Sequence, residues 1–237
     1  MKAIPTIVSV AFAAALGGGC TDRSTPTQGL INASVTSSTN TSVVFDAVGD
    51  IPVSSPGVNK QAPAWLDIVS ASITRKDGRF ILETELAAPF PTDPALDPDV
   101  PPQVDHIAVA YGLDTDPTAA PIGYPFSKNE ANSQEFYLGV AWNPTGSLGL
   151  GTGVFGWLID RRPLLTGGQA TITAIPFNIQ GNRISVVVDA AALGDPPTFR
   201  WAAFTELDKV AHPPDNFCCV DDAPDFFSGA PLATWPQ

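Results

Sequence analysis

Aspartates in short turns are the side chains of this sequence best suited to bind a metal ion. Asp114 and Asp116 flank Thr115 at the end of an apolar run, and Asp105 lies shortly before that run. Because Ca²⁺ prefers carboxylate and carbonyl oxygens, this turn is predicted to hold a structural calcium ion. The alternative is that each aspartate bonds its own backbone, which needs no metal. The same two interpretations apply to the other acidic turns, which contain Asp46, Asp50, Asp221, Asp222 and Asp225.

Aromatic rings are the second feature that could bind a ligand, because a flat ring stacks on the apolar face of a sugar. Most rings are expected in the core, among them Trp201 and Tyr111, which lie in alternating apolar runs. Trp142 stands beside an Asn-Pro turn, and Tyr124 lies in a Gly-Tyr-Pro loop. These two rings are therefore predicted to be exposed candidates for carbohydrate binding, with burial in the core as the alternative.

The sequence does not favour haem chemistry. Cytochromes that bind haem through Met and His need both residues, but the only methionine is Met1, which export would remove. His106 and His212 are instead predicted to be packed or surface side chains, so no haem is expected. The adjacent Cys218 and Cys219 are predicted to form a disulfide, with two free thiols or an intermolecular bridge as alternatives.

No motif in the chain predicts a specific reaction. Residues 151–156 read G-x-G-x-x-G, but no helix is expected after them to meet a nucleotide phosphate. Ser147 lacks the first glycine of a nucleophile elbow, because Thr145 occupies that position. A carboxylate pair for glycoside cleavage stays open as an alternative, since acidic residues are abundant. A non-enzymatic role is therefore favoured over catalysis.

Apolar residues that alternate with a period of two dominate the chain after residue 42 and indicate β-strands. The clearest runs are Phe80–Leu86, Ile107–Leu113, Phe136–Trp142 and Phe199–Ala203. The other strand candidates are Val43–Asp46, Leu66–Thr74, Ser147–Ile159, Gln169–Phe177 and Arg183–Val188. About nine strands separated by turns predict an all-β antiparallel sandwich. One short helical turn is expected at Asp189–Leu193, with Asp189 as its cap and Gly194 as its stop.

The start of the chain has the composition of an export signal. Residues 1–16 combine a basic start with a mostly apolar run that is shorter than the roughly 20 residues needed to span a bilayer. Gly17–Gly19 then precede Cys20, an arrangement that resembles a bacterial lipoprotein signal. The resemblance implies that residues 1–19 are removed and Cys20 is lipidated; the alternative is an ordinary secretory signal with Cys20 left as a thiol. Residues 20–42 are predicted to be a flexible Ser/Thr-rich tether.

Composition limits the partners of the remaining chain. The protein has 237 residues with 12 basic and 24 acidic side chains, a formal charge of −12. Such an acidic surface repels phosphate backbones, so nucleic-acid binding is not expected. A hydrophobic content of 44% supports a core, and residues 43–237 are predicted to form one β-sandwich domain. Because the rest of the chain has no second long apolar segment, membrane contact is expected only through the lipid anchor.

Several segments, in their order along the chain, carry a family resemblance. They are Phe45–Asp50, Trp65–Ile73, Tyr111–Asp116, Trp201–Thr205 and Asp221–Asp225. This order resembles bacterial extracytoplasmic β-sandwich domains of the family 9 carbohydrate-binding-module-like and DOMON-like group. The resemblance implies a jelly-roll-like sandwich that binds a ligand and does not cleave it. Related sandwich modules often carry structural calcium, which favours the calcium interpretation of the acidic turns.

These observations together predict a non-enzymatic lipoprotein of the bacterial envelope, exposed at the surface or in the periplasm. Its expected ligand is a carbohydrate or an envelope polysaccharide. Two alternatives stay open: a polysaccharide-active hydrolase that uses a carboxylate pair, and a scaffold that binds another envelope protein.

Overall fold

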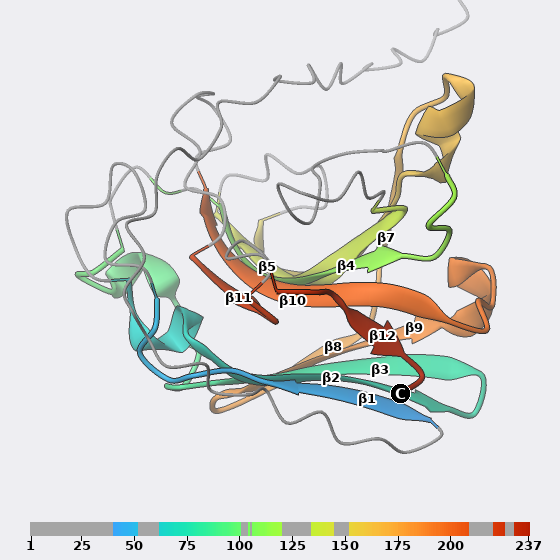
Figure 1. The fold of residues 1–237 in the computed structure, drawn as a ribbon. Helices are drawn as coiled ribbons and strands as arrows, with labels where there is room; N and C mark the ends of the chain where they lie inside the picture. The colour runs from blue at the N-terminus through green and yellow to red at the C-terminus, as the bar shows by residue number, and fades with distance from the viewer. Residues whose placement is uncertain are drawn as a thin grey trace, which may run out of the picture.

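The computed structural model describes residues 40–51, 62–100, 104, 106–119, 134–144, 152–208, 220–225 and 230–237. These residues form two antiparallel sheets that pack face to face as a sandwich (Figure 1), together with four short 3-10 turns and no α-helix. The predicted all-β sandwich is thus confirmed. No helix in this part of the chain has the length and apolar character needed to cross a membrane.

The first sheet has five strands in the order β1–β2–β3–β9–β8. Their bounds are Thr41–Phe45 for β1, Ile68–Lys76 for β2, Arg79–Leu86 for β3, Arg183–Asp189 for β9 and Phe177–Gln180 for β8. The strand β1 begins inside the segment predicted to be a tether. It is held there because Ser42 is buried and its hydroxyl accepts a hydrogen bond from Trp201 Nε1 at 2.9 Å.

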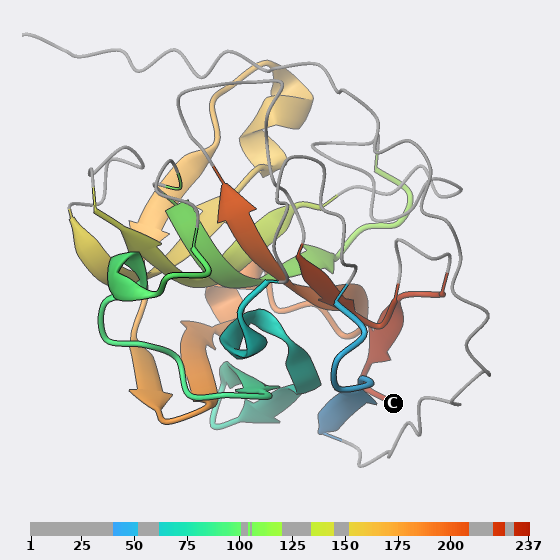
Figure 2. The same cartoon turned by 90° about the vertical axis from the view of Figure 1, so that its left-hand side faces the viewer.

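The second sheet has seven strands, with β12 paired to β10 outside the order β11–β10–β4–β5–β6–β7. The longer strands are β10 (Phe199–Asp208), β4 (His106–Asp114), β5 (Phe136–Asn143) and β6 (Gly153–Asp160). The shorter ones are β11 (Asp221–Ala223), β7 (Thr171–Ala174) and β12 (Ala233–Trp235). Figure 2, which views the sandwich from its side, shows that β12 lies against β1 of the other sheet.

The core lies between the two sheets and follows the alternation of the strands. In β3 the inward residues Phe80, Leu82 and Leu86 are fully or almost fully buried. Phe80 makes edge-to-face contacts with Phe199 and Trp235 across the core, an arrangement that aromatic rings prefer. The strands β4 and β5 are buried on both faces, and their outward side chains belong to a second apolar cluster on the outer side of the seven-stranded sheet.

Two local predictions differ from the structure, and a third agrees with it. The run Gln169–Phe177 is two strands in different sheets, β7 and β8, because Pro176 between them has no N–H to continue a ladder. The predicted helical turn exists as the 3-10 turn η4 (Ala190–Leu193), and Gly194 ends it with a φ of +82°. Asp189, however, makes no side-chain cap there, since its carboxylate pairs with Arg79 at 3.1 Å.

Candidate metal centre

A cluster of five aspartates lies at one end of the sandwich, where the two sheets come together. Asp46 and Asp50 belong to the loop after β1, and Asp67 precedes β2 in the same sheet. Asp221 begins β11 of the other sheet, and Asp225 follows that strand. Because β11 lies against β2, carboxylates from distant parts of the sequence meet across the sandwich.

The inner part of this cluster is a triad of Asp50, Asp67 and Asp221. Each residue offers a carboxylate oxygen, and the three oxygens lie within 4.8 Å of one another. Asp67 and Asp221 are each only 3% exposed. Asp67 Oδ2 accepts a hydrogen bond from the backbone N–H of Gly49 at 2.7 Å, and Asp221 Oδ2 accepts one from the N–H of Ile68 at 2.6 Å. These backbone donors fix both carboxylates in place.

Asp67 brings to the inner triad a carboxylate oxygen that has no hydrogen-bond donor among the described residues. Asp67 Oδ1 is buried, and no group in the described part of the chain donates a hydrogen bond to it. A buried carboxylate oxygen without a donor costs free energy, so such an atom indicates a ligand that is positively charged or carries a proton.

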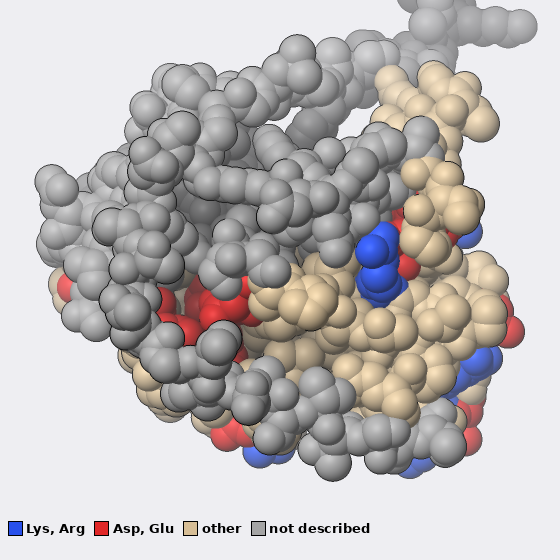
Figure 3. All heavy atoms as spheres, viewed as in Figure 1, with Lys and Arg blue, Asp and Glu red and all other residues tan. Residues whose placement is uncertain are grey.

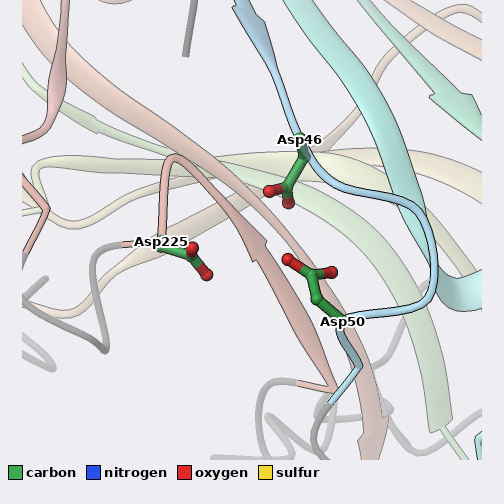
Figure 4. A group of neighbouring side chains, drawn as sticks. All are labelled: Asp46, Asp50 and Asp225. Carbon is green, nitrogen blue, oxygen red and sulfur yellow. The ribbon is translucent and has the colours of Figure 1, made fainter. Parts of the chain in front are cut away.

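The outer part of the cluster is a second triad that shares Asp50 with the first. Asp46, Asp50 and Asp225 also place carboxylate oxygens within 4.8 Å of one another, and Figure 4 shows the three side chains converging. Asp46 Oδ1 accepts a hydrogen bond from the N–H of Ala47 at 3.0 Å. Its Oδ2 atom is buried and has no hydrogen-bond partner within the described ranges.

The carboxylates of the cluster repel one another. Burial, together with the charges of Asp221, Asp50 and Asp225, raises the pKa of Asp46 to about 9. Burial is also the largest reason why the pKa of Asp221 rises to about 8, and Asp50, Asp222 and Asp67 raise it further. Figure 3 shows acidic side chains gathered toward the left of the face that it draws. At neutral pH the cluster therefore holds protons unless a cation replaces them.

The local sequence explains how the loop reaches Asp67. Asp46 continues the β1–β2 ladder through a hydrogen bond from its N–H to the carbonyl of Val69 at 3.0 Å. The chain then turns back at Gly49, whose φ of +85° suits glycine. This turn aims the Gly49 N–H at Asp67 and brings Asp50 between the two triads.

A pocket of about 220 Å³ lies beside the inner triad. Asp67 lines it together with Gly49, Ile51, Pro63 and Asp99. The pocket thus combines two carboxylate residues with small apolar surfaces next to the candidate ion position.

The turn predicted to bind calcium has protein partners of its own. Asp114 is fully buried and pairs with Arg200, whose Nε lies 2.9 Å from Asp114 Oδ2. Burial is the main reason why the pKa of Asp114 is raised. Asp116 Oδ1 accepts hydrogen bonds from the N–H and the hydroxyl of Thr118, which lower its pKa. Among the described residues neither aspartate belongs to a group of three acids close enough to share an ion. The alternative interpretation, in which such an aspartate bonds the backbone of its own turn, fits Asp116, whereas Asp114 pairs with the side chain of Arg200 on another strand.

The exposure predicted for Trp142 is wrong. Its ring is 7% exposed and belongs to the main core cluster, because position 142 falls on the inward set of the alternating strand β5, with Phe136 and Leu138. The remaining predicted site residues lie outside the described residues: Cys20, Asp105, Tyr124, Cys218 and Cys219.

Asp67 was not among the predicted ligands, although its place in an apolar run could have indicated it. The residue stands between Leu66 and Ile68, both of which are fully buried. An aspartate within an apolar run is rarely buried without a partner, so this position could have been recognised as a ligand candidate.

The chain's sequence matches no protein-family model and no curated protein. The structure shows a two-sheet antiparallel architecture. The resemblance to the carbohydrate-binding-module-like and DOMON-like group is a proposal.

Proposed function

We propose that this protein is a non-enzymatic binding domain whose sandwich is stabilised by a calcium ion held by Asp50, Asp67 and Asp221. The observation that carries the proposal is Asp67 Oδ1, a buried carboxylate oxygen that accepts no hydrogen bond within the described part of the chain. It belongs to a triad whose oxygens lie within 4.8 Å of one another. Because the Ca²⁺–oxygen distance is about 2.4 Å, one ion can contact two oxygens that lie up to about twice that distance apart. The oxygens of the triad meet this condition.

The chemistry of the donors favours calcium over softer metals. All the ligand candidates of the triad are carboxylate oxygens, with no His or Cys in the group. Hard oxygen ligands suit Ca²⁺ and Mg²⁺, whereas Zn²⁺ sites favour nitrogen and sulfur. Calcium also accepts 6–8 ligands in irregular arrangements, which suits a site assembled from a loop and the ends of two strands.

Chelation and mutation test the calcium proposal. At free calcium 100 times the Kd, binding is expected to add about 2.7 kcal/mol of stability, which raises the melting temperature by about 5–10 °C in a domain of this size. The variant Asp67→Asn is expected to lose most of this shift, because it removes a negative charge from the ion's position.

The matched control for that experiment is Asp77→Asn. Asp77 is exposed in the β2–β3 turn at a φ of +51°, a conformation that Asn also adopts readily. This variant is expected to keep the full calcium shift. A wild-type melting temperature that is the same with calcium and with chelator would contradict the proposal.

A carbohydrate or an envelope polysaccharide is the ligand that we propose for the domain. The pocket beside Asp67 supports this proposal, because carboxylates accept hydrogen bonds from sugar hydroxyls while Ile51 and Pro63 offer apolar contact. A glycan array is expected to show binding with calcium present and weaker binding after chelation. Release of reducing sugar from a bound polysaccharide would instead support the hydrolase alternative, and retention of another envelope protein would support the scaffold.

Export and anchoring complete the proposal. A lipidated Cys20 would hold the domain at the bacterial envelope, in the surface or periplasmic compartment where its ligand is expected. Mass spectrometry of the mature N-terminus tests this location. An unmodified Cys20 thiol would contradict the lipid anchor.

A further inference from the structure

We propose that the acidic cluster holds two calcium ions bridged by Asp50, an inner ion on Asp67 and Asp221 and an outer ion on Asp46 and Asp225. This inference rests on the proposed calcium function and extends it to a second site. The two triads share Asp50, whose two carboxylate oxygens can serve one ion each.

Geometry separates the two positions. Within each triad the oxygens lie within 4.8 Å of one another, but no group among the described residues that meets this criterion contains both Asp46 and Asp67. A single ion with Ca²⁺–oxygen distances of about 2.4 Å therefore does not reach oxygens of Asp46, Asp50 and Asp67 together in this arrangement. Figure 4 shows the outer position, with Asp46 and Asp50 entering from the loop after β1 and Asp225 from beyond β11.

Each triad contains its own buried oxygen that lacks a hydrogen-bond donor. In the inner triad this atom is Asp67 Oδ1, and in the outer triad it is Asp46 Oδ2; both statements refer to donors among the described residues. An ion in the inner triad would satisfy Asp67 and leave Asp46 Oδ2 buried without a partner. The second ion removes this remaining cost.

The charge of the cluster leads to the same stoichiometry. Five carboxylates meet here, and none of the ion pairs formed within the described part of the chain involves Asp46, Asp67 or Asp221. When cations have replaced the protons of the cluster and all five carboxylates are ionised, one Ca²⁺ neutralises two of the five negative charges and leaves three. Two ions reduce the excess to a single negative charge.

Two bridged ions would clamp the two sheets together. Asp46, Asp50 and Asp67 belong to the side of β1 and β2, whereas Asp221 begins β11 and Asp225 follows it. Each ion would therefore join both sheets, and Asp50 would couple the two positions.

Native mass spectrometry and titration calorimetry of calcium-free protein test the inference. The wild type is expected to bind two Ca²⁺ ions per chain. Asp46→Asn and Asp225→Asn are each expected to bind one, because both remove a ligand of the outer ion and leave the inner triad intact. Asp225 is exposed, so its variant tests the outer site without changing a buried residue. The control Asp77→Asn is expected to bind two ions.

The outcomes separate this inference from the proposed function. A wild type that binds one ion, with no change in Asp46→Asn and Asp225→Asn, would overturn the second site and leave the single calcium site in place. A wild type that binds none would overturn both. Two ions retained by Asp46→Asn and by Asp225→Asn would also overturn the inference, because these residues would then not be ligands.

Discussion

Asp67 combines almost complete burial with a carboxylate oxygen that accepts no hydrogen bond from the described residues. Asp114 is as deeply buried, yet it pairs with Arg200. The same residue type thus has two environments: a carboxylate opposite a guanidinium is neutralised by the protein, whereas one among other carboxylates becomes neutral by holding a proton or by binding a cation. Only the neighbouring side chains distinguish the two cases. Arg200 lies far from Asp114 in the sequence, and Asp221 lies far from Asp67.

The raised pKa of Asp46 leads to a prediction for the calcium-free protein. Its folded pKa of about 9 lies above the ordinary value of 3.8, so the folded state holds this proton more tightly than the unfolded state does. The resulting stability is fully present below about pH 4 and is lost as the pH rises through 9. The contribution of Asp221, whose pKa is about 8, to stability also falls as the pH rises. In chelator, the melting temperature of the wild type is expected to fall between pH 5 and pH 9.

The variant Asp46→Asn isolates this effect. Because Asn is neutral without taking up a proton on folding, the variant is expected to melt about 2–4 °C higher than the wild type at pH 8 in chelator, which corresponds to roughly 1 kcal/mol in a domain of this size. The difference is expected to shrink toward pH 5, because the free-energy cost of protonating Asp46 on folding falls as the pH approaches its ordinary pKa of 3.8. Thermal melts monitored by circular dichroism measure both quantities, and Asp77→Asn is expected to follow the wild type. Equal melting temperatures of wild type and Asp46→Asn at pH 8 would contradict the assigned repulsion.

At the scale of elements, period-two patterning located the long strands because large apolar side chains occupy the alternate positions that face the core. The runs Phe80–Leu86, Ile107–Leu113 and Phe136–Trp142 all lie within observed strands. The strands β11 and β12 have three residues each, too few to show a period, and they are held by pairing with β10. The pattern also could not show that β4 and β5 are buried on their outer faces, since their small residues there carry little hydropathy.

One of those small residues gives a prediction for the pairing of β4 and β5. Gly139 lies opposite Ala110, and a Cβ at this position would collide with the carbonyl of Val109 and lie 2.7 Å from Ala110 Cα. Since both obstacles are backbone, Gly139→Ala is expected to destabilise the domain by roughly 1–3 kcal/mol. Denaturant unfolding measures this loss. The exposed substitution Asn178→Ala in β8 is the control and is expected to stay within about 0.5 kcal/mol of the wild type. A stability of Gly139→Ala equal to that of the control would show that the strands can separate to admit the methyl group.

At the scale of the whole molecule, the acidic cluster joins parts of the chain that are far apart in sequence. Asp46 and Asp50 follow the first strand, while Asp221 and Asp225 flank a short strand near the C-terminus. The cluster lies where β11 of one sheet meets β2 of the other, and Ile68 and Asp221 already form a buried hydrogen bond across this junction. Cations bound here would therefore stabilise the packing of the sheets, and not only one loop.

The strand pattern, the acidic composition and the three aspartate-rich turns could all be recognised from the sequence, because each depends on residues that are neighbours along the chain. Those turns are equivalent when considered one at a time. The tertiary structure separates them by bringing the first and third together around Asp67 and by placing Arg200 against the second. Whether a carboxylate meets an opposite or a like charge depends on how the sheets pack, and a local pattern carries no information about residues that meet only across the sandwich.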